Sequence, residues 1–425
     1  MNTKILLMAA MISLASAANA AVTKSRRHSE KGVTSILINE QADSASNVEK
    51  AFQHNVPTSP RENFLPRFAI IGKDRQFYLG IGAQFLGEAV FDWGDHMPSA
   101  LEFIPSSITP RTPGNGAELD FAWQTSSIQL NFIAMPNTHN TIGLYFKGNF
   151  NATKGFKMSH LYAKYRGLTA GYTNSIFTDG AAMPFTIDDQ GPNGYPKVSL
   201  MTAYWTQTFS HGFSGAIGID APTANFTEST SAKLVSQRIP AIPLYVQYAY
   251  NDADDHIRIS GLIRPMQYRN LERNHNSTLL GLGIQLSGIT HLVGPVSFSY
   301  NAAYGQGIAT YLQDTNGLGL DATPSATDGK LTMPRTLGLT AGLSFNISRK
   351  VSANLIYSHL TNWLGHNASP QPSTYRFGDY AAANIIYNIN RFLRCGIEYD
   401  YGHTKHFNNS SLHTNRLQAQ LALTF

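Results

Sequence analysis

Hydrophobic and polar residues alternate along most of the chain from residue 76 onward, which is the pattern of a half-exposed β-strand. In the segment 336–347, the odd-numbered residues are apolar and the even-numbered ones are small or polar. The segment 393–401 repeats this arrangement, with Leu, Cys, Ile and Tyr opposite Arg, Gly, Glu and Asp. A strand buried on both faces would not carry such a polar row. Each strand is therefore expected to have one apolar face and one wet face.

This alternation predicts about sixteen strands, and an even number is favoured because both ends of a bacterial barrel usually lie on the same side of the membrane. They fall at 76–91, 117–135, 141–151, 157–166, 169–176, 196–209, 211–220, 240–250, 255–264, 275–289, 292–307, 332–347, 350–360, 375–389, 392–402 and 412–425. Tight turns such as 348–349 alternate with long loops rich in Gly, Pro, Asn and Ser. The long loops are expected at 92–116, 177–195, 221–239, 308–331 and 361–374.

These strands predict an all-β fold, a transmembrane antiparallel β-barrel of about sixteen strands that is porin-like. A membrane helix needs about 20 consecutive apolar residues, and no stretch after the first twenty residues approaches that length. The mean hydropathy of −0.19 also excludes a bundle of such helices. Hydrocarbon offers backbone groups no water, so strands can cross it only as a closed barrel.

The first twenty residues have the features of an export signal. Lys4 supplies a positive charge, an apolar stretch follows, and Ala18-Asn19-Ala20 forms a small-x-small cleavage site. Residues 1–20 are therefore expected to be removed, which would leave Ala21 as the new N-terminus.

Residues 21–66 are polar and keep no convincing helical period, although a weak helix is possible from about Asn39 to Phe52. We expect a polar periplasmic N-terminal segment. A flexible lead-in, a plug and a partner-binding segment are all compatible with it. The barrel would then comprise residues 67–425.

The end of the chain carries the most specific signal. From Leu417 to Phe425, the odd-numbered residues are apolar, and the residues opposite them are mainly polar. An alternating strand that ends on Phe425 resembles the assembly signal of bacterial outer-membrane barrels. It implies the barrel-assembly machinery and outer-membrane lipid as partners, and the bacterial outer membrane as the location.

Composition removes several function classes. The formal charge of +5 falls to +4 once the signal is removed, which is too small a charge to argue for nucleic-acid binding. One cysteine rules out a disulfide framework. No nucleophile motif, phosphate loop or metal-binding motif occurs, so no catalytic residues, metal site or cofactor are expected. Ser358 and His359 cannot form a catalytic dyad with each other, because neighbours in a strand point to opposite faces.

A barrel of sixteen strands encloses an aqueous channel, whose selectivity depends on inward residues and infolded loops. The wet faces of the strands supply a row of basic candidates for the pore lining: Lys164, Arg166, Arg258, Arg264 and Arg394, accompanied by Glu398 and Asp400. Such a row would attract anions. Alternatively, these charges pair with acids across the wall and only line a wet lumen.

The segment 171–194 combines apolar residues with three carboxylates, Asp179, Asp188 and Asp189. We hypothesise that this loop folds inward and narrows the pore, so that its acids face the basic wall. An ordinary exposed loop is the competing interpretation.

The run from Gly171 to Phe177, followed by Pro184, Ile187-Asp188 and Gly191-Pro192, resembles the strand-and-loop signature of the DcaP-type dicarboxylate porins. The segment 74–82 is similar to the opening strand of that family. The resemblance implies a homotrimeric channel of sixteen strands for small anionic solutes. It also implies an N-terminal periplasmic coiled coil, which residues 21–66 do not match because they lack a heptad pattern.

The function expected from all these features is a porin for passive uptake of small hydrophilic solutes, anionic ones such as dicarboxylates in particular, without enzymatic activity. Two alternatives stay open. One is a surface-adhesion or structural barrel without an open pore, and the other is an outer-membrane hydrolase.

Overall fold

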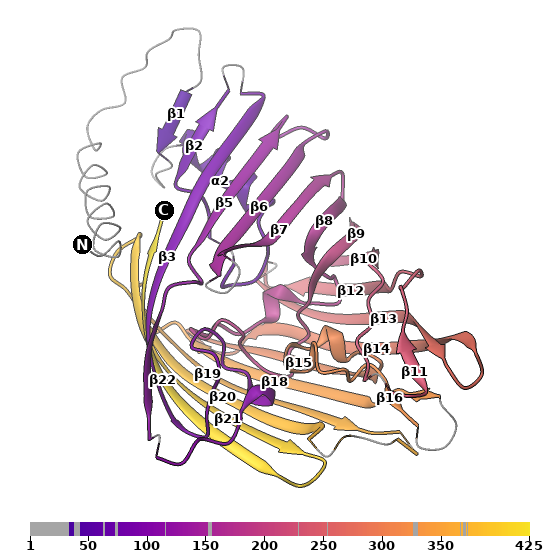
Figure 1. Cartoon of the computed structure of the whole chain (residues 1–425). Helices are drawn as coiled ribbons and strands as arrows, with labels where there is room; N and C mark the ends of the chain where they lie inside the picture. Colours follow the sequence, from indigo (N-terminus) through magenta and orange to yellow (C-terminus); the bar gives the residue numbers. More distant parts are fainter. Residues whose placement is uncertain are drawn as a thin grey trace.

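The structure, a computed structural model, describes residues 34–37, 43–62, 64–72, 75–114, 116–151, 155–227, 229–252, 254–325, 330–365, 367–368, 371 and 373–425. In this part of the chain, sixteen antiparallel strands form one closed barrel (Figure 1). They are β3 (Phe77–Gly94), β5 (Ser127–Ala134), β6 (Ile142–Asn151), β7 (Gly155–Tyr165), β8 (Leu168–Asn174), β9 (Ser199–Thr208), β10 (Phe213–Asp220), β12 (Ile242–Tyr250), β13 (Asp255–Asn270), β14 (His275–His291), β15 (Val296–Gln306), β18 (Arg335–Phe345), β19 (Val351–Trp363), β20 (Tyr375–Asn388), β21 (Leu393–His406) and β22 (Ser411–Thr424).

The predicted fold class is confirmed, and each predicted strand corresponds to a barrel strand. The long strand predicted over 117–135 is divided into β4 (Glu118–Ala122) and β5. These two pieces pair with successive halves of β3. The short strand β11 (Ala232–Leu234) was not predicted; it pairs with the outer end of β13. A two-stranded sheet of β16 (Thr323–Pro324) and β17 (Leu331–Thr332) lies within a loop.

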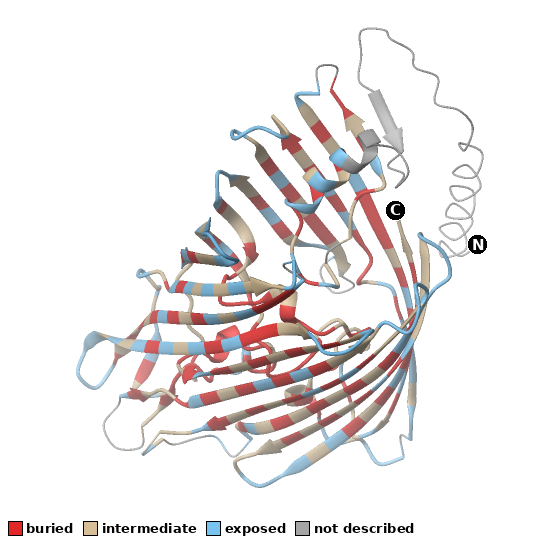
Figure 2. Ribbon diagram, turned by 180° about the vertical axis from the view of Figure 1, so that it is seen from behind, coloured by how far each residue is buried: buried red, intermediate tan, exposed pale blue. Residues whose placement is uncertain are grey.

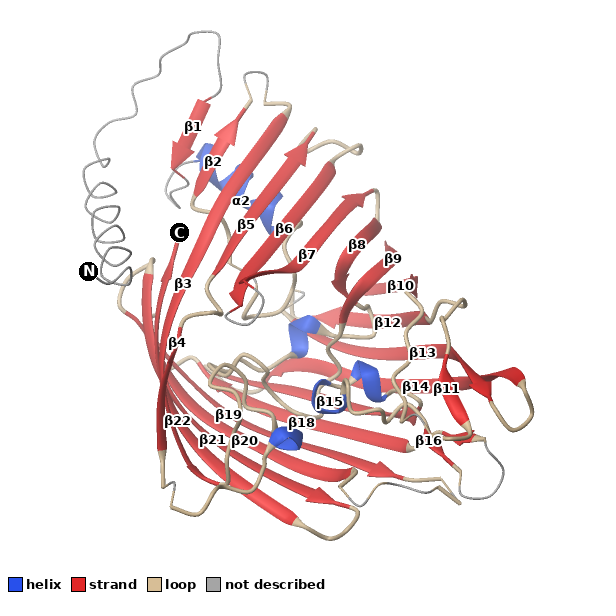
Figure 3. Ribbon diagram, in the orientation of Figure 1, coloured by secondary structure: helices blue, strands red, loops and turns tan. Residues whose placement is uncertain are grey.

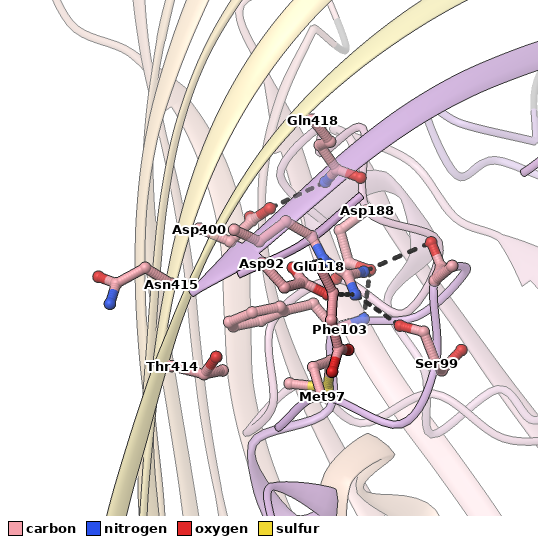
Figure 4. Close-up of polar contacts among 12 residues, drawn as sticks. Asp92, Met97, Ser99, Phe103, Glu118, Asp188, Asp400, Thr414, Asn415 and Gln418 are labelled. Carbon is pink, nitrogen blue, oxygen red and sulfur yellow. Dashed lines mark hydrogen bonds and ion pairs between the residues drawn. The ribbon is translucent and has the colours of Figure 1, made fainter. Parts of the chain in front are cut away.

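The barrel closes where β22 pairs with β3, from Thr414 opposite Gly94 to Thr424 opposite Gln84. A buried ion pair crosses this closure on the inside: Nε and Nη2 of Arg416 each lie 2.8 Å from an oxygen of Asp92. Arg416 also donates to the carbonyl of Ala100. Figure 4 shows Asp92 among the polar residues that join β22 to the loop after β3.

The apolar faces of the strands point outward. Along β13, Ile257, Ile259 and Ile263 are exposed, whereas Ser260 and Arg264 are buried. Buried and more exposed positions alternate along many strands of the wall in Figure 2. An apolar surface that continues around the whole wall is too large for a protein surrounded by water. It is the surface that hydrocarbon covers in a membrane barrel.

The connections differ in length at the two ends of the barrel, as predicted. The short-turn end has tight connections such as 166–167 and 209–212, and the C-terminus lies at this end (Figure 1). In the first of these turns, Arg166 and Gly167 both have positive φ, 46° and 87°, which matches the twist of a hairpin. The long-loop end carries the connections 95–117, 175–198, 221–241, 307–334 and 364–374.

Several long loops fold back into the barrel instead of extending away from it. Loops 175–198 and 307–334 contain the short helices η2 (Gly180–Ala182), η3 (Ala309–Tyr311) and η4 (Gln313–Thr315), and loop 95–117 contains η1 (Pro105–Ser107). Their apolar residues form a core with inward residues of the wall, a core that includes Phe177, Leu312 and Leu262. The lumen is therefore narrowed by packed protein.

The N-terminal part of the described chain contacts the inner wall near the short-turn end (Figure 3). Helix α2 (Asp43–Gln53) confirms that a helix forms near the expected position. Strand β1 (Thr34–Leu37) pairs with β2 (Phe68–Ile71), and β2 pairs with β3 beyond the end of β22. The signal at 1–20 lies outside the described residues, and the division into 1–20, 21–66 and 67–425 stays a prediction.

Among the described residues, no helix is long and apolar enough to cross a bilayer.

Candidate functional site

A polar cavity of about 430 Å³ opens inside the barrel, between the wall and the infolded segments. Strands β3, β6, β7, β8 and β9 form one side of it. The other side comes from Arg61 and Glu62 and from the loops 95–117, 175–198 and 307–334. Its charged lining consists of seven side chains: Arg61, Glu62, Glu102, Lys147, Lys157, Asp189 and Lys197.

Two of the four cations in this lining are engaged by acids. The Arg61 guanidinium lies 3.0 Å from the Asp189 carboxylate and donates to the carbonyl of Asp188. The Glu62 carboxylate lies 3.8 Å from Lys197 Nζ and 3.5 Å from His160 Nε2. Burial alone would raise the pKa of Glu62, but Lys197 and His160 lower this pKa well below its ordinary value. Burial alone would lower the pKa of Arg61, but Asp189 raises it. Arg61 and Glu62 are therefore charged at neutral pH.

The other two cations, Lys147 and Lys157, form no ion pair among the described residues. Lys147 Nζ lies 5.3 Å from the ring centroid of Phe64. Both lysines line the cavity, so their positive charge acts on a solute that occupies it. In the described part of the chain, a solute inside therefore meets two cations without an ion pair, two ion pairs and Glu102.

Two carboxylates fasten loop 175–198 to the wall and to the neighbouring loop. Asp179 accepts hydrogen bonds from Ser287 Oγ at 2.7 Å and His256 Nε2 at 2.8 Å, and it lies 3.5 Å from Arg258. Burial alone would raise the pKa of Asp179, but Arg258 and His256 lower it. Asp188 accepts hydrogen bonds from the backbone N–H groups of Phe103 and Gly191 at 2.7 and 2.8 Å.

The buried carboxylate of Glu398, on the barrel wall, also holds this loop in place. Glu398 accepts hydrogen bonds from the backbone N–H groups of Ile187 and Asp188 at 2.8 and 2.7 Å. Gln418 donates to both Glu398 and Asp400, and Figure 4 shows its contact with Asp400. Burial raises the pKa of Asp188 to about 7. The loop position is thus defined by hydrogen bonds from backbone to carboxylate.

The basic residues predicted for the pore lie on the inner wall or at its rim, but none of them lines the polar cavity. Lys164 Nζ donates to the carbonyl of His54 at 3.0 Å, and Arg166 contacts Asn140 in the exposed short turn. Arg258 stacks on Tyr245, with 4.1 Å from its guanidinium carbon to the ring centroid.

Arg264 and Arg394 bind loops. Arg264 is 1% exposed and forms a bidentate pair with Asp321 at 2.6 and 2.8 Å. Arg394 lies over the ring of Phe185, 5.1 Å from its centroid. Of the predicted loop acids, Asp179 and Asp188 are buried and Asp189 lines the cavity. A role of these eight residues in selectivity stays a prediction.

The sequence interpretation missed most of the charged cavity lining. Lys147 follows the alternation of β6 and could have been found from it, since Leu144 is exposed and Tyr145 is buried. Lys157 could not, because it lies three residues before the buried His160. A register shift lets Lys147 pair with His160 and Gly148 with Met158. This irregularity at Ser159 brings both Lys157 and His160 to the inside.

No protein-family model matches the chain, and no curated protein matches its sequence. Among solved structures, the outer membrane channel DcaP of Acinetobacter baumannii is similar at a TM-score of 0.72 with 16% identity, over 84% of this chain and 99% of that one. The chain has the fold of an outer-membrane porin. The resemblance to DcaP expected from the loop signature is confirmed in the fold.

Other outer membrane proteins share this fold at lower similarity. An anion-selective porin from Comamonas acidovorans matches with a TM-score of 0.53 and 9% identity, over 82% of this chain and 100% of that one. The trimer form of OmpT from Vibrio cholerae has a TM-score of 0.51 and 8% identity, over 82% and 99% of the two chains. At these identities, the likeness concerns the porin fold alone.

Proposed function

We propose that this protein is an outer-membrane channel that takes up small anionic solutes, with dicarboxylates as the leading class. The observation that carries the proposal is a polar cavity inside a porin fold that is lined by Lys147 and Lys157, two lysines that form no ion pair with any described residue. Cations at a constriction raise the local concentration of anions and lower the barrier for their passage. The anion-selective porin of similar fold agrees with this assignment.

We further propose that the exported chain assembles as a homotrimer in the bacterial outer membrane. One similar structure is a trimer form, and the strand that ends at Phe425 would engage the barrel-assembly machinery. Removal of the signal at 1–20 belongs to the same proposal.

Planar-bilayer recording in a salt gradient tests the channel function. We expect conductance steps in groups of three and a reversal potential that favours anions, with small di-anions reducing the current. A barrel that is folded and heat-modifiable but electrically silent would favour the surface-adhesion alternative. Cation preference would show that the acids of the cavity outweigh its lysines.

Acidification is expected to increase the preference for anions. Burial raises the pKa of Glu102, and nearby Asp189 raises it further, while the pKa of Asp188 is about 7. A carboxyl whose pKa is raised binds its proton at a higher pH than usual, so Asp188 loses negative charge as the pH falls from 8 to 5.5, and Glu102 begins to lose its charge at a higher pH than an ordinary glutamate. Glu62 stays ionised because its pKa is lowered.

Reversal potentials at pH 8 and pH 5.5 measure this effect. In Glu102→Gln the shift should be smaller, because that position no longer titrates. A wild-type preference that moves toward cations at pH 5.5 would contradict the assignment.

A further inference from the structure

A row of polar side chains crosses the outward face of the barrel near the long-loop end. His359 on β19 lies opposite Asp379 on β20, which lies opposite His403 on β21, which lies opposite His413 on β22. Their neighbours on the same face, Tyr357 and Tyr399, are exposed. Ionisable groups on a wall that faces lipid are costly and mark functional sites by default. The channel has no use for this row because it lies outside the lumen.

Together with Ser411, which lies beside the row, two of its side chains have the order of a nucleophile, a base and a carboxylate. Ser411 Oγ lies 2.8 Å from His403 Nε2, and His403 Nδ1 lies 3.0 Å from Asp379 Oδ2. If His403 Nδ1 donates to the carboxylate, Nε2 is the acceptor for the Ser411 hydroxyl. This arrangement makes a serine nucleophilic in hydrolases of unrelated folds.

Asp379 is held in place by further donors. His359 Nδ1 and the Tyr357 hydroxyl both donate to Asp379 Oδ1 at 2.8 Å. The side chains of His403, Asp379 and His359 are 22%, 23% and 27% exposed, and Ser411 is exposed. Asp379 thus orients the His403 imidazole through Nδ1, the nitrogen that does not contact Ser411. Ser411 itself is exposed on the outward surface.

An apolar hollow of about 430 Å³ on the outward wall is lined in part by Tyr357, whose hydroxyl donates to Asp379. Its floor contains the small residues Ala341, Ala381 and Ala383, and its sides include Leu355, Tyr357 and Tyr399. Ala381 follows Asp379 by two residues on the same face of β20. The hollow therefore extends from the Asp379 end of the row toward the middle of the strands.

A basic residue lies on the strand next to the nucleophile. Lys405 is the direct cross-strand partner of Ser411, and its Nζ lies 6.0 Å from the ring centroid of Phe377 on β20. A side-chain rotation toward Ser411 would bring this ammonium group to an ester oxygen under attack, where it would stabilise the developing negative charge.

We propose that Ser411, His403 and Asp379 form a site on the outer wall that hydrolyses acyl esters of membrane lipids. Ser411 Oγ attacks the ester carbonyl carbon, and its proton passes to His403 Nε2. The bond from that carbon to the alcohol oxygen then breaks, and the alcohol leaves with the proton from His403. Water attacks the acyl-serine with His403 as base, which releases the fatty acid and restores Ser411.

In this site, Ser411 and His403 are catalytic residues and Asp379 is a positioning residue. The acyl chain of the substrate lies in the apolar hollow. The proposal is independent of the solute that the channel conducts.

Full-length protein, folded in detergent micelles, is exposed to an alkyl fluorophosphonate and then digested for mass spectrometry. The expected result is a phosphonyl group on Ser411, formed as the serine oxygen displaces fluoride. Ser410→Ala is the matched control: Ser410 is the adjacent exposed serine, and its hydroxyl contacts His406, which has no aspartate partner among the described residues. Labelling should persist in Ser410→Ala and be absent in Ser411→Ala.

Hydrolysis of p-nitrophenyl esters measures turnover. Ser411→Ala should lower the rate by at least about 100-fold while channel conductance and heat-modifiable mobility stay unchanged. Asp379→Asn should lower the rate and shift its pH profile, an effect that a merely structural aspartate would not have. Ala383→Phe, which fills the hollow, should slow long-chain esters more than acetyl esters.

Two results would overturn the proposal. The first is wild-type protein that conducts ions but neither hydrolyses esters nor carries a label on Ser411. The second is hydrolysis that survives in Ser411→Ala.

Discussion

Exchange of both Lys147 and Lys157 for glutamate is expected to turn the channel from anion preference to cation preference. These lysines are the two cavity cations without an ion pair among the described residues, so no acid is left unpaired by the exchange. The charged lining changes from four cations and three acids to two cations and five acids. The sign of the potential inside the cavity should reverse accordingly.

The size of the effect follows from Coulomb's law. A unit charge 8 Å from a passing ion contributes about 0.5 kcal/mol in water, and screening at 0.1 M salt roughly halves it. Each Lys→Glu exchange replaces a positive by a negative charge, so it changes this interaction energy by twice that amount. The change has opposite signs for anions and cations. The ratio of anion to cation permeability should therefore fall by at least roughly tenfold.

Reversal potentials of the wild type and the double variant test this prediction in the same salt gradient. Arg166→Glu is the matched control, since Arg166 is exposed in a short turn at the rim. It should change the permeability ratio much less. If Arg166→Glu reversed the preference and the lysine pair did not, the constriction would lie at the short-turn end.

The barrel could be predicted from the sequence because its determinants are local. A strand that faces lipid on one side and water on the other imposes a period of two, and β13 or β22 shows that period without help from other residues. The charged cavity depends on contacts between distant segments. Arg61 meets Asp189, and Glu62 meets His160 and Lys197; no local pattern encodes these pairs.

This difference between local strand patterns and long-range loop contacts also explains where the predicted basic residues lie. Strand alternation predicts Arg258 and Arg264 for the inner face, and in the structure they contact Asp179 and Asp321 of two infolded loops. It could not show that infolded loops would cover them. Asp179 and Asp321 form ion pairs with these guanidinium groups. The polar cavity opens instead beside β3 and β6–β9. The position of a residue in the alternation of its strand determines which side of the wall its side chain faces. The packing of the infolded loops determines whether that side chain contacts water.

The second large effect concerns the N-terminal segment, whose residues 47–62 and 64–66 occupy space inside the barrel. Val48 and Phe52 pack in a buried cluster with the wall residues Tyr78 and Ile133. Behind them, Tyr162 donates to the carbonyl of Asn55 at 2.6 Å. The segment then continues to Arg61 and Glu62, which line the cavity. Its attachment therefore sets both the width and the charge of the passage.

The double variant Val48→Asp with Phe52→Asp is expected to release this segment and raise the single-channel conductance to a multiple of the wild-type value. Removal of a buried phenylalanine costs about 3–5 kcal/mol, and a buried unpaired carboxylate adds several more. The segment would then be more stable in water than against the wall. Gln53→Asp is the control, since Gln53 is exposed on the same helix, and its conductance should stay at the wild-type value. Equal conductance in the double variant and the wild type would show that the segment does not limit the passage, whereas larger steps with weaker anion preference would identify Arg61 as part of the filter.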